Sequence, residues 1–213
     1  MSSFKRLNIN SAPGLAGIAG ALILVVGDLT ASLSTPNYSI ISDSISSLAL
    51  TRLGWLQTVG FLMMGLLVEV FVAGLFFNIR RARGFHLGIG LLVCLGFGLL
   101  LIGAFRMDPV GAQHTVEGMI HSATAYALSL VFPIAILLLA PSLKSDPNWK
   151  GTFVYTLVAG VLALALTMGL LWLPDRMGWF GLYQRIVVAN VITWVGLIAV
   201  HLLRLSLRRQ PKP

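Results

Sequence analysis

Six long apolar stretches constrain this chain more than any other feature of its sequence. They cover approximately residues 13–32, 53–77, 86–105, 118–140, 151–173 and 186–205. Each is close to the roughly 20 residues that a helix needs to cross the hydrocarbon layer of a bilayer. Lipid offers no hydrogen-bond partner to a free backbone group, so such stretches must be helical. The sequence therefore predicts an all-α bundle of six transmembrane helices.

The composition excludes other classes of protein. Hydrophobic residues make up 57% of the 213 residues and charged residues only 10%, whereas soluble domains carry about 25% charged residues. The one cysteine, Cys94, lies inside an apolar stretch, which excludes a disulfide scaffold. No connecting segment is long enough for a soluble domain. We therefore expect residues 1–213 to form a single transmembrane domain surrounded by lipid.

The net charge of +8 predicts orientation, not nucleic-acid binding. The basic residues lie in short clusters between the apolar stretches and do not gather on one face. Eleven lysines and arginines would lie on one side of the membrane and four on the other. The positive-inside rule then places both termini in the cytoplasm, in a plasma (inner) membrane protein.

Several residues indicate how the helices end and pack. Pro141 is expected to end the fourth helix. Gly14, Gly17 and Gly20 predict close helix packing inside the bundle, or a dimer face, so the oligomeric state is left open. Tryptophans at the span ends are expected to be interfacial anchors: Trp55, Trp149, Trp172 and Trp179.

Mixed polar residues concentrate in the three connections expected at the outer face. Ionisable groups near a membrane are costly, so they usually pair or serve a function. We expect these connections to converge on one polar site that binds a small solute, an ion or a lipid headgroup. Arginine is suited to anionic headgroups through forked hydrogen bonds. The candidate ligand-binding residues are Ser47, Arg106, Arg176, Tyr183, Gln184 and Arg185.

A second pattern indicates a divalent metal such as zinc. His114, Glu117 and His121 are spaced to share one face of a helix that begins near His114, and Asp108 is a candidate fourth ligand. Two turns of helix separate the histidines by roughly 10 Å, so both bind one ion only if the helix begins later. The alternative is a hydrogen-bonded cluster in which the acids pair with arginines.

The run from Asp43 to Ser47 offers serine hydroxyls that a base such as His121 could activate. The catalytic candidates are accordingly His121 as base or metal ligand, with Asp108 and Asp43 orienting it. Serine and aspartate ahead of an apolar stretch are also ordinary helix caps. Both interpretations are left open.

Two further groups of ionisable residues have simpler interpretations. Glu69, inside the second stretch, is expected to pair with a polar residue such as Asn190 or Thr193, or to serve an ion or proton role. Haem is not favoured, because His114 and His121 share a helix face and cannot be opposite axial ligands.

Four motifs carry a family resemblance. They are Ser42-Asp43-Ser44-Ile45-Ser46-Ser47-Leu48, Gly103-Ala104-Phe105-Arg106-Met107-Asp108-Pro109, Gly118-Met119-Ile120-His121 and Gly181-Leu182-Tyr183-Gln184-Arg185. With them the chain resembles, over almost its whole length, the bacterial and archaeal membrane family catalogued as domain of unknown function 998. The resemblance implies about six spans, no agreed activity, and these motif residues: Asp43, Ser47, Asp108, His121 and Arg185. The resemblance favours a site that contains His121 alone over a metal site that contains both His114 and His121.

Three functions are compatible with these residues. The first is a membrane protein with an outward-facing binding site. The second is a membrane-embedded, metal-assisted hydrolase or transferase acting on lipid. The third is an accessory subunit without chemistry of its own. A membrane-embedded enzyme needs its polar groups clustered at one level of the membrane, and the polar residues of this sequence gather in this way in the three outer connections. No motif, however, defines a reaction.

Overall fold

A computed structural model of the chain describes residues 9–172 and 178–208. The described part holds six long helices, and each is long and apolar enough to cross a membrane. They are α1 (Ala12–Ser34), α2 (Gly54–Asn78), α3 (Phe85–Ala104), α4 (Val116–Ser145), α5 (Phe153–Trp172) and α6 (Phe180–Arg208). Short 3-10 helices are η1 (Ile9–Ser11), η2 (Ile45–Leu50) and η3 (Lys150–Thr152). The predicted all-α architecture with six candidate spans is confirmed.

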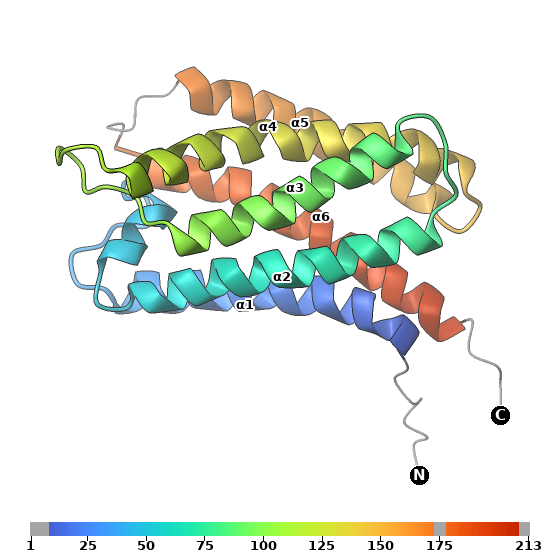
Figure 1. Cartoon of the computed structure of the whole chain (residues 1–213), viewed down its shortest axis with the longest axis horizontal. Coiled ribbons are helices and arrows are strands. Elements are labelled where there is room, and N and C mark those ends of the chain that lie inside the picture. The colour runs from blue at the N-terminus through green and yellow to red at the C-terminus, as the bar shows by residue number, and fades with distance from the viewer. Residues whose placement is uncertain (1–8, 173–177, 209–213) are drawn as a thin grey trace, which may run out of the picture.

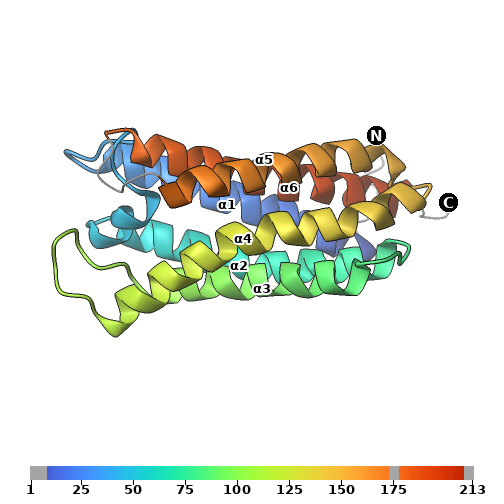
Figure 2. The ribbon, with the colours of Figure 1, turned by 90° about the horizontal axis from the view of Figure 1, so that it is seen from above.

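The six helices run side by side and form a ring in chain order (Figures 1 and 2). Each packs on the next, and α1 packs on α6 to close the ring. The Ser206 hydroxyl donates to the Ser11 hydroxyl at 3.2 Å, so the start of α1 lies beside the end of α6. Residues 35–53 and 105–115 lie together at the opposite end of the bundle, on the left in Figure 1. We call it the site end.

An aromatic cluster fills the middle of the ring. The Trp194 ring on α6 meets Phe71 on α2 edge-on, with centroids 6.4 Å apart, and Phe132 on α4 at 5.8 Å. All three side chains are buried. The Trp194 indole donates to the Thr156 hydroxyl on α5 at 3.1 Å, which satisfies its one polar atom. We call Phe71, Phe132 and Trp194 the aromatic floor, because they lie beneath the site end.

The glycines of α1 allow its neighbours to approach closely. A Cβ on Gly14 would lie 2.7 Å from the Cβ of Leu203, and one on Gly17 would lie 2.6 Å from the Cβ of Ala199. Both contacts are to α6. Van der Waals packing replaces hydrophobic drive between helices in lipid, so this closeness holds the ring together. The predicted packing of small residues inside the bundle is confirmed.

The predicted end of α4 at Pro141 is wrong. The helix continues to Ser145, with Pro141 inside it. The connection before α3 secures the added turn: the amide of Ala82 donates to the Ser142 hydroxyl at 3.1 Å and that of Arg80 to the Asp146 carboxylate at 2.9 Å. Membrane helices tolerate proline where neighbouring elements compensate in this way.

Trp149 is not an interfacial anchor. It is fully buried, its indole donates to the carbonyl of Asn78 at 2.9 Å, and its ring lies 4.8 Å from that of His201. It therefore joins η3 to α2 and α6. The other predicted anchors are at least 44% exposed, as anchors would be: Trp55, Trp172 and Trp179.

The predicted pairing of Glu69 with Asn190 is also wrong. Glu69 on α2 faces α3, where its carboxylate lies against Gly96. The Asn190 amide instead donates to the carbonyl of Ala159 on α5 at 3.0 Å. The two residues therefore belong to different helix contacts.

Candidate functional site

The first connection, residues 35–53, lies directly on the start of α6. The amide of Leu182, in the first turn of α6, donates to the carbonyl of Ile41 at 2.9 Å. The amide of Ile45 donates to the side-chain oxygen of Gln184 at 2.7 Å. A Cβ on Gly181 would collide with the backbone of Asp43, so only glycine permits this approach. The first turn of a helix has free amide groups, and here the connection satisfies one of them.

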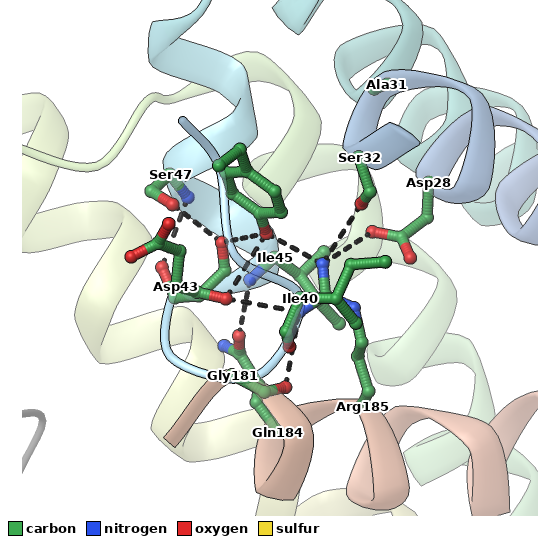
Figure 3. A network of polar contacts seen from close by, with 12 residues as sticks. Asp28, Ala31, Ser32, Ile40, Asp43, Ile45, Ser47, Gly181, Gln184 and Arg185 are labelled. Atoms are coloured by element: carbon green, nitrogen blue, oxygen red, sulfur yellow. Dashed lines mark hydrogen bonds and ion pairs between the residues drawn. The ribbon is translucent and has the colours of Figure 1, made fainter. Parts of the chain in front are cut away.

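Arg185 holds this arrangement together (Figure 3). Its side chain is only 14% exposed. Nη1 donates to the carbonyls of Ile40 at 3.0 Å, Asp43 at 3.1 Å and Gly181 at 3.3 Å. Nη2 donates to the Tyr38 hydroxyl at 2.7 Å, Ser32 Oγ at 3.2 Å and Asp28 Oδ1 at 3.4 Å. One guanidinium therefore joins α1, the first connection and α6.

The electrostatics favour a structural role for this arginine. Asp28, whose side chain is 17% exposed, balances the buried positive charge. Both terminal nitrogens of Arg185 have partners inside the protein, so the geometry does not leave them to an anionic headgroup. Burial raises the pKa of the Tyr38 phenol, which keeps the proton that it donates to the carbonyl of Ser44 at 2.8 Å.

Asp43 reaches Arg185 through its backbone, not its carboxylate. The carboxylate accepts from the amide of Ser39 at 2.7 Å and so closes its own turn. Hydrogen bonds of this local kind are common for aspartate in loops. The contact between Asp43 and Arg185 is present in the structure, but it is made by a main-chain carbonyl.

His121 forms the second polar centre at the site end. Its side chain is 5% exposed. Nδ1 lies 2.8 Å from the carbonyl oxygen of Phe105, and Nε2 lies 3.0 Å from Oγ of Ser46. A carbonyl oxygen can only accept, so in a neutral ring the proton is on Nδ1 and Nε2 is free to accept from the Ser46 hydroxyl. Residues 43–46 of the first connection link this centre to that of Arg185.

Asp108 lies at the start of α4, against Gly118, and makes no hydrogen bond to His121 in the described part of the chain. Its carboxylate accepts from the amide of Thr115 at 2.9 Å and from the Thr115 hydroxyl at 2.7 Å. These bonds lower the pKa of Asp108. Thr115 in turn caps α4, because its hydroxyl oxygen accepts from the amide of Gly118 at 3.0 Å.

The predicted metal ligands are not brought together. Because Thr115 is the cap, α4 begins after His114, which is 88% exposed and 3.8 Å from Asp108. Glu117 is exposed in the first turn, while His121 is buried. Within residues 9–172 and 178–208, no three histidine, cysteine or acidic side chains are grouped as a metal site requires.

Two of the remaining candidate residues make hydrogen bonds to main-chain carbonyls. The Ser47 hydroxyl donates to the carbonyl of Ser44 at 2.7 Å, inside η2, whose N-cap is Ser44. The Tyr183 hydroxyl donates to the carbonyl of Leu166 on α5 at 2.7 Å. Arg106 is exposed on the surface. Arg176 lies outside the described residues.

A cavity of about 380 Å³ lies beneath the first connection, inside the ring. Ser46, His121 and Gln184 contribute polar groups to its wall. Most of the wall is apolar and includes Phe61, Met64, Leu95, Leu99, Val191 and Ile192. Along α2 and α6 these residues precede Phe71 and Trp194, so the aromatic floor lies below the cavity. Val110 and Tyr126 line it and are also 84% and 47% exposed, so it reaches the surface.

A smaller cavity of about 230 Å³ adjoins the first. Asp28, Gln57 and Arg185 line it. The Gln57 side chain is 1% exposed, and neither of its amide atoms has a hydrogen-bond partner in the described structure. Sequence reasoning did not select Gln57 or Tyr38, and it offered Ser46 only as one of the serines in the run from Asp43 to Ser47. Asp28 carries a further signal in the sequence, as a carboxylate within an apolar stretch.

Comparison with known proteins finds one family. The family model described as "Protein of unknown function (DUF998)" matches residues 18–201. The matched segment includes Asp28, Ser46, His121 and Arg185. No curated protein and no solved structure matches the chain.

Proposed function

We propose that this chain, which belongs to the DUF998 family, is a multi-pass membrane protein that binds an amphiphile in the cavity beneath its first connection. By amphiphile we mean a molecule with an apolar chain and a polar head. The observation that carries the proposal is the cavity itself. Its volume of about 380 Å³ lies within the range of ligand pockets.

The wall of the cavity matches the two parts of such a molecule. Side chains such as Met64, Leu99 and Val191 suit an alkyl chain. Ser46, His121 and Gln184 provide hydrogen-bonding groups for a polar head. The Gln184 amide nitrogen makes no hydrogen bond to any described residue, so it is available to a ligand. Exposed Val110 and Tyr126 mark where the ligand enters.

The aromatic floor favours binding over transport. Transporters commonly place their site near the midplane, between discontinuous helices. In this bundle, Trp194 with Phe71 and Phe132 fills the level below the cavity. A ligand entering from the site end would therefore have to leave by the same end.

The test of binding is a cavity-filling substitution. Val191→Trp is expected to weaken binding of a fluorescent fatty-acid derivative by roughly tenfold or more, because the larger ring occupies the space of the chain. Leu197→Trp is the matched control, since Leu197 lies on the same helix and is 51% exposed. Wild-type affinity in Val191→Trp, or an equal loss in Leu197→Trp, would contradict the proposal.

The proposed orientation has the site end outside the cell and both termini in the cytoplasm of a plasma-membrane protein, in accordance with the basic bias. In a Cys94→Ala background, a membrane-impermeant thiol reagent should label Gln113→Cys in intact cells and leave Ser145→Cys unlabelled. Both positions are exposed, at opposite ends of the bundle. Labelling of Ser145→Cys from outside would reverse the orientation.

A further inference from the structure

The hydroxyl of Ser46 is directed differently from those of its neighbours. The hydroxyls of Ser47 and Thr51 donate to local carbonyls, at 2.7 Å each, as is usual for such residues in turns. The Ser46 hydroxyl instead reaches Nε2 of His121, 75 residues away in the sequence, at 3.0 Å. It makes no other hydrogen bond in the described part of the chain.

The histidine is oriented as a general base must be. Its Nδ1–H is held by the carbonyl of Phe105 at 2.8 Å, so the Nε2 lone pair is directed at Ser46. In serine–histidine catalysis a third group holds the imidazole in this tautomer. Here a backbone carbonyl has that position, as it does for many histidines whose second nitrogen is functional.

The serine is held on a rigid support at the cavity wall. Its neighbour Ile45 is bonded to Gln184 at 2.7 Å, and Arg185 secures the turn before η2 through the carbonyl of Asp43. Ser46 and His121 both line the cavity, so a ligand bound there lies against the hydroxyl. Reactive groups fixed in this way are what nucleophilic catalysis requires.

We infer that Ser46 is a nucleophile, that His121 is its general base, and that the pair transfers the acyl group of an amphiphilic ester bound in the cavity. This inference rests on the proposed function and adds a reaction to it. An ester fits because its acyl chain matches the apolar wall and its carbonyl would lie at the polar end.

The reaction balances with the groups present. Ser46 Oγ bonds to the ester carbonyl carbon while its proton passes to His121 Nε2. The bond to the alcohol oxygen then breaks, and the alcohol leaves with that proton. Water or a second alcohol attacks the acyl-serine, gives its proton to His121, and releases an acid or a new ester as Ser46 regains its proton. The free Gln184 amide is the available donor for the carbonyl oxygen.

The test uses the full-length protein in detergent and a long-chain alkyl fluorophosphonate, which bonds covalently to activated serines. Peptide mass spectrometry is expected to locate the adduct on Ser46. Ser46→Ala should not be labelled, whereas Ser145→Ala should be labelled as the wild type is. Ser145 is an exposed serine whose hydroxyl donates to the carbonyl of Ser142, so it controls for unspecific reaction.

His121→Asn separates catalysis from structure. The asparagine amide can still donate to the carbonyl of Phe105 but offers no base to Ser46. Labelling of Ser46 should slow by roughly 100-fold or more, while the thermal midpoint stays close to that of the wild type. Labelling at the wild-type rate in a folded His121→Asn variant would overturn the role of His121.

Ligand binding and labelling of Ser46 are measured separately, so failure of the reaction can be told from failure of the binding function. If the wild type binds the fatty-acid derivative but Ser46 is not labelled, the reaction is overturned and the binding function stands. If neither occurs, both are overturned. Release of fatty acid from phospholipid vesicles would identify the ester as a membrane lipid. Turnover of a soluble long-chain ester alone would identify a smaller substrate.

Discussion

Arg185→Leu is expected to lower the free energy of unfolding by about 3–5 kcal/mol, the range for breaking a buried, hydrogen-bonded ion pair by removing one partner. The guanidinium is 14% exposed and contacts α1, the first connection and its own helix. Its removal leaves the Asp28 carboxylate without its counter-charge and the carbonyls of Ile40 and Asp43 without the donor they share. The first connection should therefore detach from α6.

Thermal unfolding in detergent measures this effect. Arg52→Leu is the matched control, because Arg52 is exposed at the same end and makes no hydrogen bond or ion pair with any described residue. The double variant Asp28→Leu/Arg185→Leu should recover part of the loss, since no buried charge then remains unpaired. An Arg185→Leu protein as stable as the wild type would show that the Arg185 contacts do not support the fold.

Trp194→Ala is the second substitution with a large expected effect, a loss of about 3–5 kcal/mol, as is usual when a buried aromatic is truncated. Trp194 is fully buried, touches the rings of Phe71 and Phe132, and bonds to Thr156. Its removal leaves a void and an unpaired hydroxyl in the middle of the ring. Trp172→Ala is the control, because Trp172 is 84% exposed, and its thermal midpoint should change little.

The same variant tests what closes the cavity from below. Without the indole of Trp194 the space above the aromatic floor extends further along the bundle axis. A longer fatty-acid derivative should then gain affinity relative to a shorter one in Trp194→Ala. An unchanged ratio of the two affinities would show that Trp194 does not limit the cavity.

The number of helices can be predicted from sequence because each span is a local property. A helix in lipid satisfies its own backbone, so length and hydropathy suffice. The ends are less predictable. The apolar pattern predicts a sixth span over residues 186–205, whereas α6 begins at Phe180 and includes Arg185. Carbonyls and Asp28 surround the arginine in the folded protein, and none of these partners is adjacent in the sequence.

The candidate site was predictable in its residues but not in their roles. Asp43, His121 and Arg185 stand out because polar groups beside apolar spans need partners, and the structure gives all three such partners. The spacing of His114 and His121 indicated a metal, but spacing does not fix where a helix begins. Thr115 caps α4 after His114, which leaves that side chain on the surface.

Hydropathy and charge act locally along the chain, so a membrane protein with six helical spans and polar connections follows from the amino-acid sequence alone. Which serine of the first connection meets His121 does not follow from it. That meeting depends on helix packing and on Arg185, which fixes the first connection on α6. Contacts between residues 75 positions apart are set by the packing of the whole ring, which no local pattern encodes.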